Sequence, residues 1–121
     1  MKTPKPILER RRSVRIQEAL PFRIDSKGYD FQAVTINISC HGALCFVDKD
    51  IALMTQLDIA LPIPGIQGSS RKQPIIHLRG VVVRKEKDSV SGKYCIAVFF
   101  SRVKPRDEKL LKKFIDSRLK A

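Results

Sequence analysis

The stretch YDFQAVTINIS, from Tyr29 to Ser39, decides the fold of this chain. It is rich in β-branched and aromatic residues, which favour strands, and its side chains alternate along the chain. Because successive side chains of a strand point to opposite faces, the alternation predicts that Val34, Ile36 and Ile38 face a core. The residues between them are expected to face away from it: Ala33, Thr35, Asn37 and Ser39. We therefore expect a long strand with one buried face.

Further strands are expected on either side of this one. Residues Ala19 to Ile24 would form the first arm of a hairpin, with Asp25 to Gly28 as its loop. After Gly42, the run ALCFV predicts a strand, and further β-favouring runs cover residues 56–61, 75–85 and 94–100. An exposed loop rich in proline and glycine would occupy residues 62–71. Six strands with short connections predict an all-β core, a small six-stranded antiparallel β-barrel.

The last part of the chain predicts an amphipathic helix over residues 105–119. Pro105 suits the first helical position, and Asp107 and Glu108 lie in the first turn, where the helix dipole favours acidic side chains. An apolar stripe is expected to pack on the barrel: Leu110, Leu111, Phe114, Ile115 and Leu119. The other face, expected in solvent, carries Lys109, Lys112, Lys113 and Arg118. Binding of this face to a membrane surface is the alternative.

The length of 121 residues fits one domain with one core. We expect a flexible leader over residues 1–8 and a domain over 9–121, made of an arm (9–18), the barrel (19–101) and the helix (105–119). No run approaches the roughly 20 apolar residues of a membrane span, and the first residues do not resemble a secretory signal. We therefore expect a cytoplasmic monomer, with any membrane contact peripheral. Without a second domain, it would act through a partner protein.

The cysteines and histidines do not form a motif that carries chemistry. Cys40, Cys45 and Cys95 include no CxxC pair, and we expect them to be free thiols in or near the core. His41 lies beside Cys40 but lacks a second ligand pair at zinc spacing. Neither His41 nor His77 has a nucleophile or paired carboxylate at motif spacing. We expect no metal, no cofactor and no catalysis.

The net charge of +12 is concentrated at the two ends of the chain. Residues 1–15 hold six basic and one acidic residue (+5), residues 102–121 hold eight and three (+5), and the rest hold ten and eight (+2). There is no Trp, and most of the Phe and Tyr residues lie in apolar runs expected to be core. This distribution favours a local anion site or docking patch over a long nucleic-acid track. A small basic nucleic-acid-binding barrel is the alternative.

An arginine-rich run, ERRRSVRI, starts at Glu9. It places Arg11 and Arg15 at an RxxxR spacing, directly preceded by Arg10. Arginine presents a planar fork that binds phosphate and the O6/N7 edge of guanine in bidentate fashion. By itself the run is also compatible with a solvated basic tail, a nucleic-acid arm or a positive patch on a membrane surface.

A second motif, NISCHG, ends the Tyr29–Ser39 strand. Asn37 and Ser39 are two residues apart, and Gly42 follows where the chain must turn. An amide and a hydroxyl can meet the edge of a planar heterocycle, and a glycine leaves room for close approach. The same residues are also compatible with a strand end and a tight turn.

The order RxxxR then NxSxxG resembles the PilZ domain family, bacterial receptors for the second messenger cyclic di-GMP. The family signature is RxxxR followed by D/N-x-S-x-x-G. The resemblance extends from about Glu9 to Leu119 and includes HLRGVVVRKE, GKYCIAVFF and LLKKFI. It implies a PilZ-like barrel that binds cyclic di-GMP and acts as a receptor or adaptor for an unidentified downstream protein. A degenerate PilZ-like module that binds proteins but not the nucleotide remains the other alternative.

The resemblance also implies roles for the arm. Arg11 and Arg15 would hold phosphate and the Hoogsteen edge of guanine as the arm folds over the ligand. In the family, an arginine directly before RxxxR accompanies binding of an intercalated ligand dimer, so Arg10 implies two ligands per domain. Ligand binding would then order a mobile arm and create a surface for the downstream protein.

At the strand end, Asn37 and Ser39 would contact a guanine edge and Gly42 would allow close approach. Arg12 and Arg84 are additional candidates for phosphate contact or base stacking. Asn37 stands where Asp is also common, which would weaken the guanine contact by about 1 kcal/mol. Ala97 stands where the family often has Gly, and we expect that change to affect strand packing and not the site.

Overall fold

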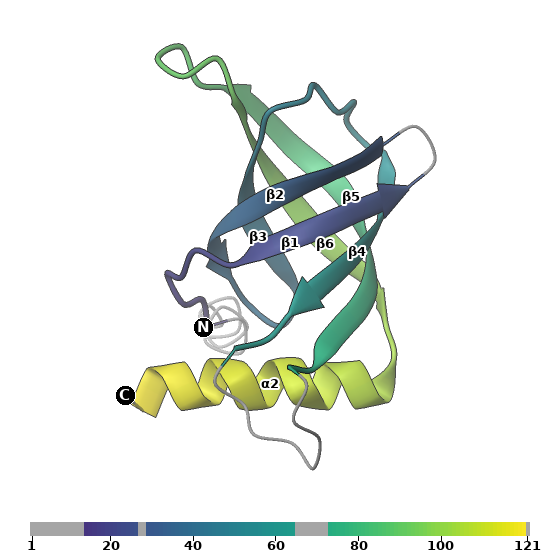
Figure 1. Cartoon of the computed structure of the whole chain (residues 1–121), viewed down its shortest axis with the longest axis vertical. Helices are drawn as coiled ribbons and strands as arrows, with labels where there is room; N and C mark the ends of the chain where they lie inside the picture. The colour runs from purple at the N-terminus through teal and green to yellow at the C-terminus, as the bar shows by residue number, and fades with distance from the viewer. Residues whose placement is uncertain (1–13, 27–28, 65–72, 121) are drawn as a thin grey trace, which may run out of the picture.

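Six strands and one helix make up the part of the chain that the computed structural model describes, residues 14–26, 29–64 and 73–120. The strands are β1 (Pro21–Ser26), β2 (Tyr29–Ile38), β3 (Gly42–Val47), β4 (Gln56–Pro62), β5 (Ile75–Lys87) and β6 (Tyr94–Val103). They close into one antiparallel barrel in the order β1-β2-β3-β6-β5-β4, and helix α2 (Pro105–Lys120) lies across one end of it (Figure 1). The predicted six-stranded barrel with a C-terminal helix is confirmed.

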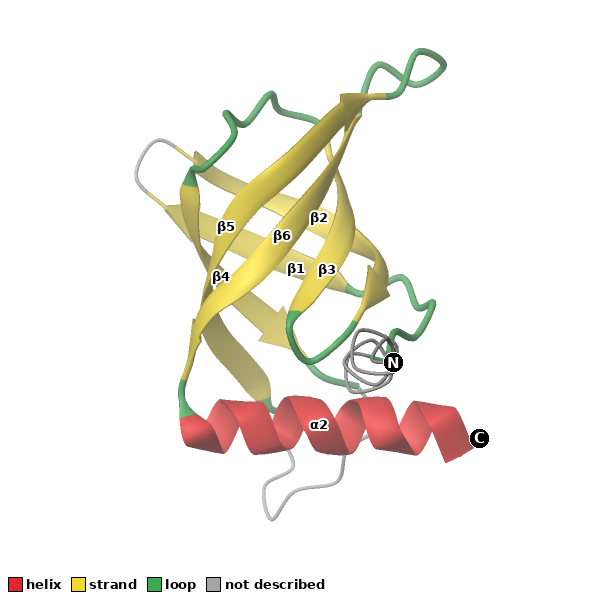
Figure 2. Cartoon of the chain, turned by 180° about the vertical axis from the view of Figure 1, so that it is seen from behind, coloured by secondary structure: helices red, strands yellow, loops and turns green. Residues whose placement is uncertain are grey.

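The two long strands β5 and β6 face the viewer in Figure 2, on the side of the barrel opposite β1 and β2. They pair from Leu78 opposite Val103 to Lys87 opposite Tyr94, with two interruptions of register on the way. Residues from all six strands fill the interior, and Leu111, Phe114 and Ile115 of α2 close the end of the core. Burying this apolar surface is what holds the barrel and the helix together.

Strand β2 does not bury the residues that its alternation predicted. Ala33 and Thr35 are buried, whereas Val34 and Ile36 are only half-buried. The register against β3 shifts between Thr35 and Asn37, so Ile36 is the extra residue of a β-bulge. Beyond the bulge the inward positions change phase, and Ile38 is fully buried as predicted. The core assignment of Val34 and Ile36 was therefore wrong, because a bulge reverses the faces of the strand.

Thr35 is buried, and its hydroxyl group has hydrogen-bond partners. Its Oγ1 accepts a hydrogen bond from the backbone N–H of Leu20 at 2.8 Å and donates one to the carbonyl of Glu18 at 2.6 Å. These bonds attach the segment before β1 to β2. A threonine on the inner face is thus tolerated because its polar group is paired.

The helix also differs from the prediction at its end. Leu119 is 51% exposed, so the apolar stripe ends at Ile115. Arg118, expected in solvent, is half-buried: its guanidinium lies 4.6 Å from the ring centroid of Phe114, and its Nε donates to Glu18 at 2.8 Å. The flat guanidinium covers the aromatic ring while its charge is paired, which an apolar-stripe argument does not anticipate. No helix among the described residues meets the length and hydropathy needed to cross a membrane.

Candidate functional site

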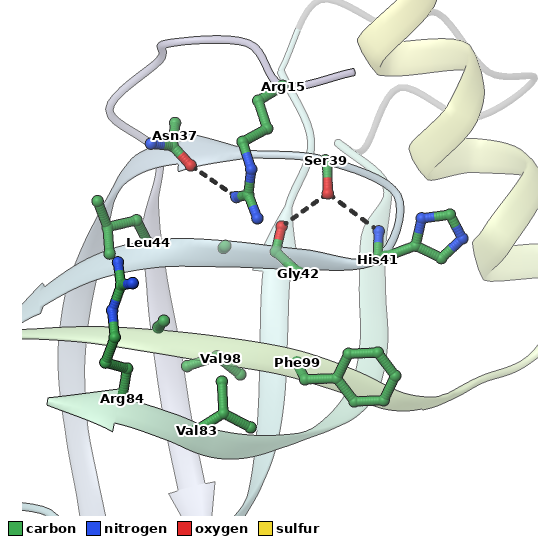
Figure 3. A pocket seen from close by; sticks show the side chains of 12 residues that line it. Arg15, Asn37, Ser39, His41, Gly42, Leu44, Val83, Arg84, Val98 and Phe99 are labelled. Carbon is green, nitrogen blue, oxygen red and sulfur yellow. Dashed lines mark hydrogen bonds between the residues drawn. The ribbon is translucent and has the colours of Figure 1, made fainter. Parts of the chain in front are cut away.

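A pocket of about 340 Å³ lies on the outer face of the barrel, over β3 and β6 and between β2 and β5 (Figure 3). Five of the predicted site residues line it: Arg15, Asn37, Ser39, Gly42 and Arg84. They come from the segment before β1, from the end of β2, the turn after it and the start of β3, and from β5. The fold thus brings together residues that lie up to 69 positions apart in the sequence (84 − 15). Arg10, Arg11 and Arg12 lie outside the described residues.

Two β-bulges position the walls of this pocket. The bulge at Ile36 turns Asn37 to the outer side, since without it Asn37 would share the inward face of Thr35. On β5, the register against β6 shifts between Val82 and Arg84, so that Val83 and Arg84 are both exposed. Each bulge therefore places a polar side chain at the rim of the pocket. In a regular strand the same side chain would point elsewhere.

Arg15 connects the two sequence motifs directly. Its guanidinium Nη1 donates a hydrogen bond to Oδ1 of Asn37 at 2.9 Å. The next residue, Ile16, is buried and exchanges two backbone hydrogen bonds with Ile38, at 2.9 and 3.0 Å. This short bridge fixes the backbone beside Asn37. Arg15 and Arg84 then enter the pocket from opposite sides (Figure 3).

Ser39 holds the turn that leads into β3. Its side chain is 1% exposed, so the expectation that it faces away from the protein interior was wrong. The hydroxyl accepts a hydrogen bond from the backbone N–H of His41 at 3.2 Å and donates one to the carbonyl of Gly42 at 3.3 Å (Figure 3). The backbone N–H of Ser39 donates to the same carbonyl at 2.8 Å. Ser39 therefore shapes the pocket wall through the backbone of the turn.

Gly42 is required by the barrel itself. A Cβ atom at this position would lie 2.5 Å from the carbonyl oxygen of Val98 on β6, which is far below a normal contact. Only glycine allows β3 and β6 to approach each other here. The motif glycine thus has a structural reason that is independent of any ligand.

The pocket floor is apolar, and the sequence analysis missed it. Phe99 and Val83 line the pocket and are each 51% exposed. On β6, Ile96, Val98 and Phe100 are buried, which turns Phe99 outward. Strict alternation within the run CIAVFF was the available signal, but the sequence analysis expected most Phe residues to lie in core runs. Ala97, expected to affect only strand packing, also lines the pocket.

The thiols near this region are weakly acidic. Burial raises the pKa of Cys40, with a further contribution from the carboxylate of Asp116 on α2. Burial likewise raises the pKa of Cys45 to about 12. All three cysteines are free thiols. Within residues 14–26, 29–64 and 73–120, no three His, Cys, Asp or Glu side chains come together as a metal site.

The chain is thus a small β-barrel domain: a closed six-stranded barrel with a helix across one end and a surface pocket lined by Arg15 and Arg84. The family model described as "PilZ domain" matches residues 9–117, which is most of the chain. The chain belongs to the PilZ domain family.

Two solved structures show the same fold. The Bacillus subtilis inhibitor of motility (MotI/DgrA) has a TM-score of 0.72 and 21% sequence identity over 89% of this chain. The chain spans about half of that protein, 51% of its length. The PilZ domain of YcgR from Escherichia coli, solved with c-di-GMP, has a TM-score of 0.62 and 16% identity, covering 89% of this chain and 90% of the other. No curated protein matches the sequence.

Proposed function

We propose that this chain binds cyclic di-GMP in the pocket over β3 and β6 and transmits that binding to a downstream protein. The observation that carries the proposal is the hydrogen bond between Arg15 and Asn37, which joins the two family motifs within one pocket. The arm would contribute Arg10, Arg11 and Arg15, and the strand end Asn37, Ser39 and Gly42. Arg84, and Arg12 of the arm, would add contacts to phosphate or to a base.

The chemistry of the pocket suits a guanine dinucleotide. A guanidinium engages phosphate oxygens or the O6/N7 pair of guanine with two parallel hydrogen bonds. The carboxamide of Asn37 both donates and accepts, so it can meet a guanine edge. Phe99 and Val83 offer an apolar floor that the flat face of a purine would cover. Cationic walls over an apolar floor fit a ligand with two anionic phosphates and two planar bases.

The guanidinium of Arg15 occupies part of this site because it is bonded to Asn37. Ligand binding would exchange that single bond to a neutral amide for two parallel bonds to an anionic phosphate or to the O6/N7 edge of guanine. The carboxamide of Asn37 would then be released toward a base edge. Arg15 thus acts as a movable group within a site whose backbone is fixed by the Ile16–Ile38 bridge.

The signalling step would be closure of the arm. Residues before Ile16 carry four arginines and one glutamate from Glu9 onward, so ligand phosphates would supply the missing countercharge. Arg10 would allow an intercalated pair of ligands, two per chain. The closed arm and the covered pocket would form a new surface for the downstream protein, without any catalytic step.

A nuclear magnetic resonance titration of the labelled chain tests the site. Cyclic di-GMP is expected to shift the backbone signals of Arg15, Asn37, Gly42 and Phe99. A single-stranded RNA of the same phosphate count is the control for charge alone, and it is expected to produce weaker and strongly salt-dependent shifts. Equal affinity for both ligands would instead support a nucleic-acid-binding barrel.

A further inference from the structure

A second surface hollow, of about 420 Å³, lies over β1, β4, β5 and β6. We call it the cationic hollow. Its charged residues are Arg23, Arg79, Arg102, Lys104, Asp25 and Asp58. It shares no lining residue with the nucleotide pocket: on β5 it uses residues 77–79, whereas the pocket uses 83 and 84.

The register of the strands explains the shape of the cationic hollow. Ala60 on β4 lies directly between Arg23 on β1 and His77 on β5. Its short side chain leaves an open floor between two longer neighbours. The barrel is closed here by only two residue pairs between β1 and β4, Arg23–Ala60 and Ile24–Ile59.

The next row across the sheet carries an unfavourable charge arrangement. Arg79 on β5 lies directly opposite Arg102 on β6, and like charges at opposed positions destabilise a sheet. Asp58 offsets one of them, since Arg79 Nε donates to its Oδ1 at 3.1 Å. Arg23 is likewise paired with Asp30. Within the described ranges, neither the guanidinium of Arg102 nor the ammonium of Lys104 takes part in a hydrogen bond or ion pair. The hollow therefore presents two cations without a paired carboxylate.

We infer that the cationic hollow binds an extended acidic segment of a partner protein. Its cations are distributed over β1, β5, β6 and the residue after β6, so they suit carboxylates spaced along a peptide more than one compact anion. Asp25 and Asp58 interrupt the positive surface and would repel the continuous phosphates of a nucleic acid. β5 and β6 run through both sites, so the hollow lies on the same two strands as the nucleotide pocket.

The test is fluorescence anisotropy of the full chain with a labelled dodecapeptide in which glutamate alternates with serine. The same peptide with glutamine in place of glutamate is the ligand control. The triple variant Arg79→Gln, Arg102→Gln, Lys104→Gln is compared with Lys109→Gln, Lys112→Gln, Lys113→Gln on the exposed face of α2, which removes the same charge. We expect the hollow variant to lose about tenfold in affinity, equal to about 1.4 kcal/mol, and the helix variant less than about twofold.

Equal losses of peptide affinity in the hollow variant and the helix variant would overturn the inference, because the affinity would then depend only on the net charge of the chain. A single-stranded RNA that binds the hollow more tightly than the acidic peptide would also overturn it. Lys104→Glu provides a check that does not disturb a strand, since Lys104 follows the last residue of β6. Its peptide affinity is expected to fall by about threefold or more. Cyclic di-GMP binding should be unchanged in all hollow variants, so failure here is distinguishable from failure of the proposed nucleotide function.

Discussion

Arg15 is the residue at which the two motifs of the sequence meet. Its bond to Asn37 holds the second arginine of RxxxR in the lining of the pocket. The sequence predicted Arg15, Asn37 and Arg84 as parts of one site, and the fold brings them to one pocket. It did not predict the burial of Ser39 or the exposure of Phe99, because both depend on which side chains face outward in the folded chain.

Phe99 gives a prediction for the pocket floor. Phe99→Ala should weaken cyclic di-GMP binding by about tenfold, since stacking of a base on an aromatic ring is worth about 1–3 kcal/mol. Phe46→Ala is the matched control, because Phe46 is also exposed but does not line the pocket. Calorimetric affinity is the measurement. If the two variants bind equally well, Phe99 is not a stacking surface.

Cys45 gives a prediction for stability at alkaline pH. Burial raises its pKa from 9.0 to about 12, so the folded state retains the thiol proton that the unfolded chain releases. This contribution is fully present below pH 9 and is lost as pH rises from about 9 to 12. Between pH 9 and 10.5, the free energy of unfolding should fall more steeply in the natural chain than in Cys45→Ala, by about 1 kcal/mol per pH unit. The free energy of unfolding is measured by urea titration of both proteins at several pH values. Equal slopes of this free energy against pH would contradict the prediction.

Among the elements, the strands carry the main departure from the sequence prediction. Alternation in β2 predicted the correct strand but the wrong inner face up to Ile36. A bulge has no strong local signature, since it depends on how two strands pair and not on one strand alone. The helix was predicted well up to Ile115, and the Arg118–Phe114 contact was missed because arginine counts as polar in a periodicity argument.

Gly42 gives a prediction for the contact between β3 and β6. Gly42→Ala should lower the free energy of unfolding by about 2 kcal/mol, because the added methyl group would press against the carbonyl of Val98. Urea unfolding measures this loss without any ligand. Unchanged stability would mean that the strands can separate to admit the methyl group, and would leave ligand approach as the reason for the glycine.

At the scale of the whole molecule, the barrel and helix followed from composition, alternation and one amphipathic stripe. The position at which the arm becomes fixed to the barrel could not be predicted in the same way. The arm was predicted over residues 9–18, but Ile16 is buried and paired with Ile38, so the hypothesis of a mobile arm applies only to residues before Ile16. Because the arm is fixed to the barrel at Ile16, the ligand has fewer residues to order. The entropy cost of folding the arm over the ligand is lower as a result.

Hydrogen exchange tests this division of the arm. In the free protein, the amides of Ile16 and Ile38 should exchange slowly, because both donate backbone hydrogen bonds. Amides of residues 9–14 should exchange fast without cyclic di-GMP and at least about tenfold more slowly with it. Slow exchange of residues 9–14 in the free protein would contradict the ordering step, even if the ligand binds.

The central claim is that this pocket binds cyclic di-GMP, and isothermal titration calorimetry tests it most directly. The natural chain is expected to show saturable binding of two ligands per chain. Arg15→Ala should weaken it by about tenfold or more, as expected for a lost charge-assisted contact, whereas Arg106→Ala at the exposed start of α2 should not. The absence of binding heat and of competition by cyclic di-GMP, or equal affinities for the natural chain and Arg15→Ala, would contradict the claim.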